Sequence, residues 1–321
     1  MGVHTALRCP PGFSSCLVLL LVSMGQVPLR PAWGQSKDLS STSAKLESIT
    51  LESKNIPGAV GVHVLLPPNA DAESGPWPLM LWLHGGGGDD ISYLERILQP
   101  LVEKAWERKE LPPMVVAVPS GRRSFYMDFK DGKEKWETFL VQELLPALRD
   151  RYKVSDQHSD TYVGGYSMGG MGSLRLAFKY PGTFSLVAAV APAIEPSYRF
   201  EDIEPRDRVY RSDATYERIF GRPVDRGYWA RNHPPTLARD QAARLVESQL
   251  DIYFEVGDQD ELGLDRGAEF LHNTLLKKGV PHEYRLIQGV GHGGNSMPNR
   301  LSDALRYVGR VKRGCSGGIG S

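Results

Sequence analysis

Three absences narrow the class of protein to which this chain of 321 residues can belong. It has only 3 cysteines, and Cys9 and Cys16 both lie near the N-terminus, so no disulfide framework is expected. It has no charge excess, with 38 basic and 38 acidic residues, which excludes the electrostatic attraction that nucleic-acid binding proteins use. It has no H-E-x-x-H motif and no paired-cysteine site, so we expect neither a metal site nor a cofactor.

A long hydrophobic run is also absent, although a short one lies at residues 16–22. Crossing a bilayer takes roughly 20 apolar residues, so we expect no membrane span here. The run follows the basic Arg8, the small residues Ala32 and Gly34 stand at the positions usual before a cleavage site, and no acidic residue occurs before Asp38. This is the pattern of a secretory signal peptide. The sequence therefore predicts a signal peptide over residues 1–34 and a secreted or periplasmic protein.

Short apolar runs alternate with helix-like segments between about residue 56 and residue 310. Several runs are continuously apolar, which is typical of strands covered on both faces. The alternation predicts an α/β domain over 56–310, with a mostly parallel central sheet and helices on both faces. Pro100 and Pro146 fall inside two helical segments and should kink or shorten them. We expect strands at 60–66, 79–83, 114–118, 162–164, 186–190, 252–256 and 283–287, and helices at 93–107, 136–152, 171–179, 239–249, 264–278 and 300–308.

Three segments depart from this alternation. Residues 193–236 are rich in Arg, Asp, Tyr and Pro and show no strand pattern. Loops longer than about 15 residues are uncommon in compact domains, and the aromatic residues argue against disorder, so we interpret this segment as a cap inserted over a site. Residues 35–55 are expected to form an N-terminal lead-in, and residues 311–321 a flexible tail.

Residues 165–169 carry the pattern G-x-S-x-G between an apolar run and a predicted helix. In that context the serine sits on a strained strand-to-helix turn, and the flanking glycines let two backbones approach closely. A second match at residues 314–318 has no strand before it and no helix after it, so we assign it to the tail. Ser167 is therefore the candidate nucleophile.

A serine hydroxyl needs a base, and the residue order expected after this turn is Ser, then Asp or Glu, then His. His292 lies in a glycine-rich loop directly after the last predicted strand, where catalytic groups of open α/β sheets collect. His272 falls in a predicted helix, and His282 precedes a strand, which favours packing roles for both. His292 is the candidate base.

The acid should follow the strand predicted at 252–256. We prefer Asp260, because it lies far enough along the loop for its carboxylate to reach back toward the histidine. Asp258 is an alternative, and its other expected role is to cap the turn by accepting local backbone N–H groups.

A second glycine-rich stretch, residues 84–90, ends an early strand. Its backbone N–H groups can approach a substrate oxygen, so we expect the N–H of Gly86, or otherwise that of Gly85, to form an oxyanion hole with the N–H of Met168. A phosphate-binding loop is disfavoured, because the G-x-x-x-x-G-K-[ST] motif is absent. We expect His84 to have a structural role.

Several stretches together resemble the esterase D family of α/β-hydrolases. These stretches are residues 81–86, 124–128, 136–146, 165–170 and 291–293, and the similarity covers most of the chain. The resemblance implies the α/β-hydrolase fold, with Ser167, Asp260 and His292 as the catalytic triad. It also implies that residues 124–128 border the cleft, with Tyr126 as a substrate contact.

The family includes feruloyl and acetyl-xylan esterases, S-formylglutathione hydrolase, siderophore esterases and secreted mycolyltransferases. The expected function is therefore hydrolysis of a carboxylic ester through an acyl-enzyme, on a small-molecule or polysaccharide substrate. The aromatic residues of the predicted cap favour feruloyl or acetyl sugar esters. Two alternatives are an acyltransferase that uses the same triad and a non-catalytic binding protein on the same scaffold.

Overall fold

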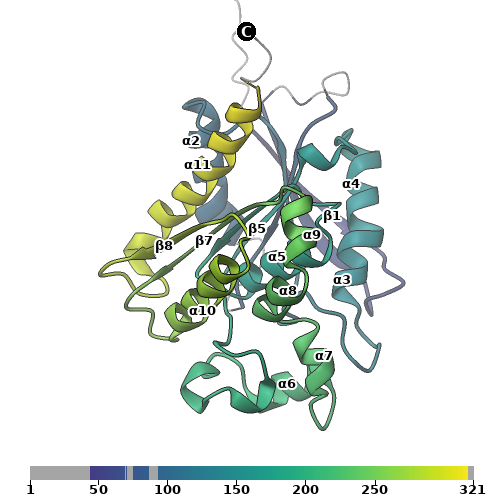
Figure 1. Ribbon diagram of the computed structural model, residues 1–321. Coiled ribbons are helices and arrows are strands. Elements are labelled where there is room, and N and C mark those ends of the chain that lie inside the picture. Colours follow the sequence, from purple (N-terminus) through teal and green to yellow (C-terminus); the bar gives the residue numbers. More distant parts are fainter. Residues whose placement is uncertain (1–43, 69, 71–74, 87–92, 317–321) are drawn as a thin grey trace, which may run out of the picture. The chain divides into compact units, whose positions relative to one another are not determined.

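The computed structural model describes residues 44–68, 70, 75–86 and 93–316 (Figure 1). The predicted signal peptide, residues 35–43 of the expected lead-in and residues 317–321 lie outside these ranges. In the described part, eight strands form one sheet in the order β1-β2-β4-β3-β5-β6-β7-β8. β2 runs antiparallel to β1 and to β4, and the other neighbours are parallel. The strands are β1 (Lys45–Leu51), β2 (Val60–Leu66), β3 (Leu79–Leu83), β4 (Val115–Pro119), β5 (Thr161–Tyr166), β6 (Leu186–Val190), β7 (Asp251–Gly257) and β8 (Glu283–Ile287).

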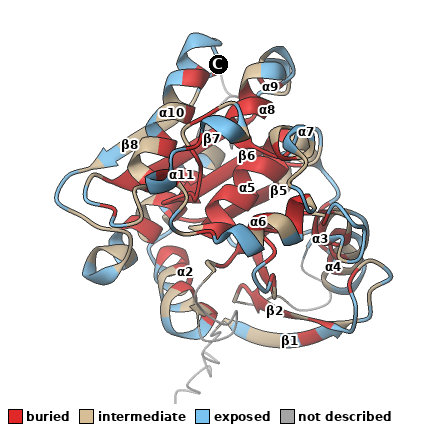
Figure 2. Ribbon diagram, turned by 90° about the horizontal axis from the view of Figure 1, so that it is seen from below, coloured by how far each residue is buried: buried red, intermediate tan, exposed pale blue. Residues whose placement is uncertain are grey.

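The central strands are buried on both faces, as their continuous apolar runs predict (Figure 2). Successive side chains of β3 therefore enter different hydrophobic clusters: Met80 and Trp82 on one face, and Leu81 and Leu83 on the other. The first cluster is completed by α2 (Gln99–Glu107) and α11 (Met297–Ser316). The second is completed by α3 (Trp136–Thr138), α4 (Leu145–Tyr152), α5 (Met168–Lys179), α8 (Pro234–Asp240), α9 (Ala242–Glu247) and α10 (Leu264–Lys277). The predicted α/β-hydrolase architecture is confirmed.

The N-terminal boundary of the domain differs from the prediction. Residues 45–51, expected in the lead-in, form the edge strand β1, which pairs along its whole length with β2. Polar and apolar residues mix in this strand, and Ile49 is its one buried residue. Both faces of β1 are only partly covered, since Ile49 and Leu51 contact one hydrophobic cluster and Leu46 contacts the other. The strand therefore lacks the continuous apolar run that marks the central strands.

The C-terminal boundary also differs. Helix α11 continues to Ser316, beyond the predicted start of a flexible tail at residue 311. The guanidinium of Arg313 donates to the backbone carbonyls of Lys109 and Glu110, at 2.8 and 2.9 Å. These contacts join the last turns of α11 to the loop that follows α2, which explains why the helix extends past its buried residues.

The two prolines inside helical segments change the pitch of the helix. A π-helical turn precedes each of them, at Leu94–Leu98 before α2 and at Phe139–Leu144 before α4. The N–H of Gln99 reaches the carbonyl of Leu94, five residues back. Proline lacks an N–H and crowds the preceding turn, so the helix widens there instead of breaking.

The predicted cap segment contains helices α6 (Asp213–Phe220) and α7 (Arg226–Ala230), which lie together below the sheet in Figure 1. Its aromatic residues mostly pack against one another: Phe200 makes edge contacts with Tyr216 and Trp229, and both of those side chains are buried. These aromatic side chains therefore hold the cap together. The sequence alone does not distinguish this packing role from a role in substrate binding.

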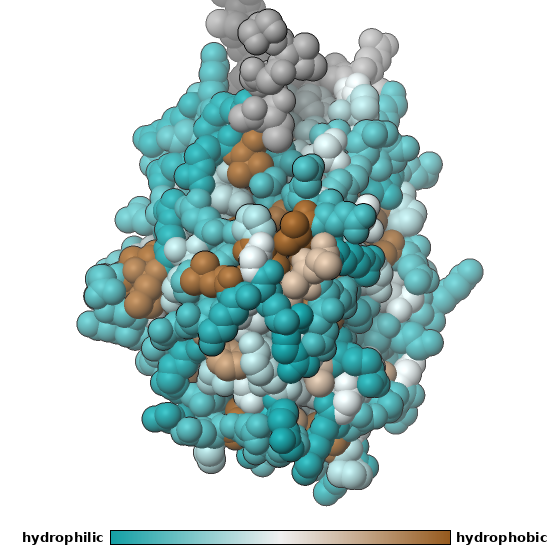
Figure 3. Space-filling view, in the orientation of Figure 1, coloured by the Kyte–Doolittle hydropathy of each residue, from teal (hydrophilic) through white to brown (hydrophobic). Residues whose placement is uncertain are grey.

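The surface carries no broad apolar area on the face shown in Figure 3, where brown side chains form small separate groups. The large apolar residues that are most exposed, Val209, Val246, Leu276 and Leu286, belong to different elements. Among the described residues, no helix combines the length and the apolar character that a membrane span needs.

Candidate active site

Ser167 stands between β5 and α5, on a backbone conformation that few residues adopt. Its φ and ψ are 55° and −114°, in a region that costs about 1–3 kcal/mol for a non-glycine residue. Three backbone hydrogen bonds hold it there: its N–H donates to Val190 at 2.9 Å, and its carbonyl accepts from Met171 and Ala193 at 3.0 and 3.1 Å. The turn is therefore fixed before any substrate arrives.

The two flanking glycines are required by close packing. A Cβ atom on Gly169 would lie 1.9 Å from the carbonyl oxygen of Leu83. A Cβ atom on Gly165 would lie 2.5 Å from the backbone of Gly169. Strand β5 and helix α5 thus approach each other and β3 at distances that only glycine permits, which is the physical basis of the G-x-S-x-G pattern.

Ser167, His292 and Asp260 form one continuous chain of hydrogen bonds. The Nε2 atom of His292 lies 2.9 Å from Ser167 Oγ, and its Nδ1 atom lies 2.8 Å from Asp260 Oδ2. The Asp260 side chain is fully buried, whereas His292 is 14% exposed. Because a carboxylate can only accept, Nδ1 carries the proton and Nε2 presents its lone pair to the serine hydroxyl. The arrangement can therefore take a proton from Ser167 and stabilise the imidazolium that results.

The two candidate acids occupy different positions. Asp258 Oδ1 accepts the N–H of Gly289 at 2.6 Å, which is the turn-capping role that the sequence left as its alternative. Asp260 instead reaches the imidazole with one oxygen and accepts the N–H of Leu262 with the other, at 3.0 Å. The remaining late histidines, His272 and His282, contact each other at 2.8 Å and make no contact with the serine.

The expected oxyanion donors lie side by side. Met168 is the first residue of α5, so its N–H has no acceptor within the helix. Gly86 is its neighbour across the site, since a Cβ atom on Gly86 would lie 3.7 Å from the Cβ atom of Met168. A Cβ on the fallback residue Gly85 would lie 3.0 Å from the Tyr166 ring. The N-terminus of a helix beside a glycine backbone can stabilise an oxyanion.

His84 has a structural role at this site. The N–H of Gly121 donates to its Nε2 atom at 2.9 Å, so Nδ1 carries the proton and donates to the carbonyl of Gly85 at 2.7 Å. The buried Tyr126 hydroxyl donates to the His84 carbonyl at 3.1 Å. These bonds fix the backbone of the glycine-rich stretch immediately before Gly86.

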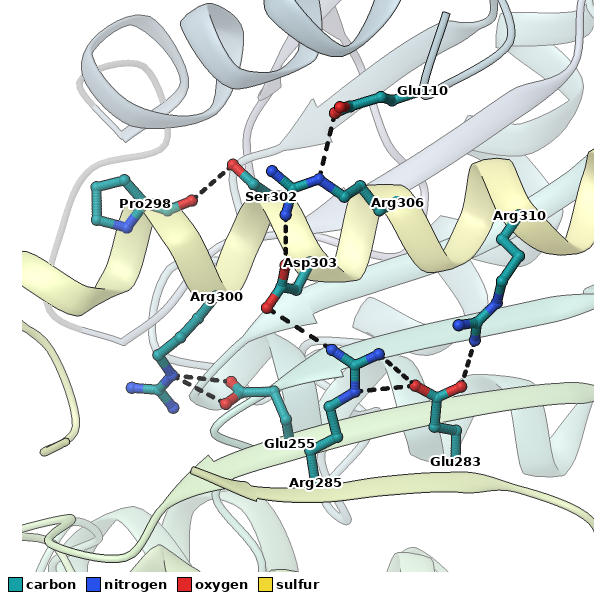
Figure 4. Close-up of polar contacts among 10 residues, drawn as sticks. All are labelled: Glu110, Glu255, Glu283, Arg285, Pro298, Arg300, Ser302, Asp303, Arg306 and Arg310. Atoms are coloured by element: carbon teal, nitrogen blue, oxygen red, sulfur yellow. Dashed lines mark hydrogen bonds and ion pairs between the residues drawn. The ribbon is translucent and has the colours of Figure 1, made fainter. Parts of the chain in front are cut away.

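Four residues that the sequence did not indicate hold the loop of His292 (Figure 4 shows two of them, Glu255 and Arg300). Glu261 accepts the N–H of His292 at 2.8 Å, and the Tyr166 hydroxyl donates to its carbonyl at 3.0 Å. Arg300 donates to the same carbonyl at 3.1 Å and to Glu255 at 2.9 Å. Burial raises the pKa of Glu255, although Arg300 acts against that rise. A charged residue inside the apolar run of β7 was the one available signal.

A pocket of about 380 Å³ opens over Ser167. Its walls are mainly apolar and aromatic, and the cap contributes Ala193 and Tyr210. Tyr126, expected as a substrate contact, does not line this pocket and is fully buried, because its backbone turns the ring into the core. The preceding residue, Phe125, faces the pocket instead. The lining residues are His84, Gly85, Gly86, Tyr93, Arg123, Phe125, Tyr166, Ser167, Met168, Ala193, Tyr210, Leu262 and His292.

A buried ion pair lies behind the pocket wall. The guanidinium of Arg211 lies 3.8 Å from the centre of the Phe125 ring and 3.1 Å from Glu195. Burial alone would raise the pKa of Glu195, but Arg211 and His233 outweigh it and lower that pKa to about 2. The charge of Arg211 is thus balanced within the protein, and it braces the aromatic wall of the pocket from behind.

A serine–histidine–aspartate chain at the carboxyl ends of the strands, in a mostly parallel sheet, defines a serine hydrolase of the α/β-hydrolase class. The family model described as "Putative esterase" matches residues 53–296. The chain belongs to this esterase family, which confirms the resemblance found in the sequence, and it is a carboxylic ester hydrolase.

Individual relatives share less than a third of their residues with this chain. The acetyl esterase of Caldicellulosiruptor saccharolyticus is 29% identical over 62% of this chain and 73% of its own length. The S-formylglutathione hydrolase of Bos taurus is 26% identical over 76% of this chain and 86% of its own. The solved structure of a ferulic acid esterase matches with a TM-score of 0.69 and 24% identity, covering 84% of this chain and 99% of that one. At this identity the structural likeness shows the fold alone.

Proposed function

We propose that this protein is an exported serine esterase that hydrolyses its substrate through an acyl-enzyme on Ser167. The observation that carries the proposal is the unbroken chain from Ser167 Oγ to His292 and from His292 to the buried Asp260, with both contacts below 3 Å. The chain ends in an apolar pocket large enough for an acyl group.

In the first half of the reaction, His292 Nε2 takes the proton of Ser167 as Oγ attacks the ester carbonyl. The carbonyl oxygen becomes negative and is held by the N–H groups of Gly86 and Met168. Asp260 stabilises the imidazolium and keeps its orientation. When the carbon–oxygen bond of the ester breaks, His292 gives its proton to the departing alcohol, and the acyl group stays on Ser167.

In the second half, water takes the place of the alcohol. His292 removes one proton from the water, which attacks the acyl carbonyl and forms the tetrahedral intermediate again. The bond to Oγ then breaks, His292 returns its proton to Ser167, and the free acid leaves. Every proton is accounted for by His292, so this cycle uses no cofactor.

The substrate we propose is a feruloyl or acetyl ester of a sugar or polysaccharide. Support comes from the names of the relatives, an acetyl esterase and a ferulic acid esterase, and from the aromatic side chains of Tyr93, Phe125 and Tyr210 around the pocket. Aromatic rings of this kind stack well on sugar and phenyl rings.

The experiment is a comparison of ester hydrolysis by the wild-type protein and the Ser167→Ala variant. We expect the wild-type protein to cleave 4-nitrophenyl acetate, methyl ferulate and acetylated xylose, and the variant to lose this activity while its circular dichroism spectrum is unchanged. Product analysis with a sugar acceptor separates hydrolysis from acyl transfer. Equal activity of the two proteins would overturn the proposal.

Export is proposed from the pattern of residues 1–34 alone. The test is mass spectrometry of the protein recovered from culture medium or periplasm. We expect its first residue to be Gln35. A protein that stays in the cytoplasm and keeps Met1 would contradict export without affecting the chemistry.

A further inference from the structure

Arg123 is the one permanently charged residue among the described residues that line the pocket. The other walls are apolar, aromatic or glycine backbone, apart from Ser167 and the histidines of the site. A single cation at the edge of an otherwise apolar pocket is a strong determinant of which substrates bind, because it attracts a group of opposite charge where little else competes.

No residue in the described part of the chain balances the charge of Arg123. Its side chain is exposed, and its guanidinium makes no hydrogen bond or ion pair with any residue in the described part of the chain. Among the described residues, the acidic groups near the site are already engaged: Glu195 pairs with Arg211, and Asp260 and Glu261 both bind His292. A ligand in the pocket therefore meets a cation with free donors.

The backbone that carries Arg123 is held firmly. Ser124 Oγ donates to the carbonyl of Gly121 at 2.6 Å and accepts the N–H of Tyr126 at 3.0 Å. The carbonyl of Arg123 accepts from Arg218 at 2.7 Å. Phe125 and Tyr126 both have a positive φ, of 54° and 57°, which non-glycine residues adopt only where the surroundings impose it. The backbone of this segment is therefore fixed, and Arg123 keeps its position relative to Phe125 and the pocket.

We propose that Arg123 selects esters that carry a negatively charged group, a carboxylate, in addition to the ester bond. A guanidinium offers paired donors that match the two oxygens of a carboxylate, and the bonds are charge-assisted. This inference rests on the proposed esterase function and adds to it the charge of the preferred substrate. The ester bond lies at Ser167 while the anionic end reaches the edge of the pocket.

The test compares charged and neutral esters of the same length. One pair carries the charge on the acyl side: mono-4-nitrophenyl adipate and 4-nitrophenyl hexanoate. A second pair carries it on the alcohol side: 3-acetoxybenzoate and its methyl ester. For each pair we define selectivity as kcat/KM for the charged ester divided by kcat/KM for the neutral one, at pH 7. Comparing this ratio between variants cancels the intrinsic reactivity of the esters.

We expect Arg123→Gln to lower the selectivity about tenfold in one of the two pairs, which also identifies the side that carries the anion. Arg123→Lys should retain part of the selectivity, and added salt should reduce it in the wild-type protein. Arg122→Gln is the matched control. Arg122 is also exposed, but its guanidinium donates to the carbonyl of Pro57 and lies over the Trp136 ring, away from the pocket lining. Its removal should leave both ratios unchanged.

The outcomes separate this inference from the proposed function. If the wild-type protein cleaves the neutral esters, Ser167→Ala does not, and Arg123→Gln leaves both ratios within about twofold of wild type, the role of Arg123 is wrong and the esterase function stands. If Arg122→Gln lowers the ratios as much as Arg123→Gln, the effect is general surface charge, and the role is again wrong. If neither the neutral nor the charged esters are cleaved, the proposed function itself fails.

Discussion

Tyr166 contacts His292 in two ways at once: its hydroxyl donates to the His292 carbonyl at 3.0 Å, and its ring stacks on the imidazole with 5.0 Å between ring centres. Tyr166 is also the residue immediately before Ser167. The same short segment therefore carries the serine and orients the histidine, although 125 residues separate the two in the chain. Tyr93 also stacks on the Tyr166 ring, with 6.5 Å between ring centres.

This contact predicts a positioning role for the Tyr166 hydroxyl. Tyr166→Phe keeps the stacked ring and loses one neutral hydrogen bond, so we expect kcat to fall about threefold to tenfold with little change in KM. Tyr166→Leu also removes the stacking and should cost more. Steady-state kinetics with 4-nitrophenyl acetate measures both. If the Phe variant loses stability but keeps full kcat, the contact supports the fold alone.

The two neighbouring aspartates should differ sharply in their effect. Asp260→Asn removes the carboxylate that holds Nδ1, and a change of this kind lowers kcat by about 10⁴-fold in serine hydrolases with the same triad. Asp258→Asn keeps an oxygen that can accept the N–H of Gly289, so we expect less than a tenfold loss. The kinetics of the two variants decide between them, and the reverse order would show that Asp258 is the acid.

A stability prediction follows from two buried glutamates, Glu137 and Glu195. Burial opposes their ionisation, but Arg175 and Lys179 lower the pKa of Glu137 to about 2, and Arg211 does the same for Glu195. A folded-state pKa below the unfolded one gives stability that is present above the unfolded value and is lost as pH falls. We therefore expect the free energy of unfolding to decrease between about pH 5 and pH 2, by on the order of 2 kcal/mol for each group.

Urea unfolding at pH 7 and pH 3 checks this dependence. The difference in the free energy of unfolding between pH 7 and pH 3 should be smaller in Glu195→Gln than in the wild-type protein. The unpaired Arg211 makes that variant less stable at both pH values. Glu107→Gln is the control, because Glu107 is exposed and has no ion pair with a described residue. A pH dependence that is the same in all three proteins would contradict the assignment.

The glycine packing at the serine turn also gives a prediction. Gly169→Ala places a methyl carbon 1.9 Å from the carbonyl oxygen of Leu83, so the serine turn cannot keep its present backbone conformation. We expect loss of activity and a drop of more than about 5 °C in Tm. Gly182→Ala is the matched control, since its Cβ would meet nothing within 4 Å. An active and stable Gly169→Ala protein would show that the turn is less crowded than the structure indicates.

Much of the fold could be predicted from local sequence, and the exceptions have physical causes. β2, β3, β6 and β8 coincide with the predicted runs, because each is an apolar or alternating stretch with clear ends. Helix α5 begins at Met168, three residues before its predicted start at Met171. The sequence predicts the later start because Gly169 and Gly170 are poor helix formers. They are retained for close packing against other strands, which local sequence does not show. Strand β1 cannot be predicted from local sequence, because its single buried residue, Ile49, does not form an apolar run.

In the candidate site too, some residues can be predicted from local sequence and others cannot. Ser167 and His292 follow from motifs that require their residue type and position. The partners of the His292 loop do not, because Glu255, Glu261 and Arg300 act through contacts formed only when β7, the following loop and α11 come together. The orientation of Tyr126 toward the core likewise depends on its backbone φ, which the sequence does not reveal.

The most direct test of the account is reaction of the purified protein with a fluorophosphonate, followed by mass spectrometry of the intact protein and its peptides. The reagent forms a stable bond with a serine only where a base activates its hydroxyl. We predict one adduct per chain, located on Ser167, with no adduct in Ser167→Ala and slow formation in His292→Ala. A folded wild-type protein that stays unlabelled, or that is labelled on another serine, would contradict the central claim.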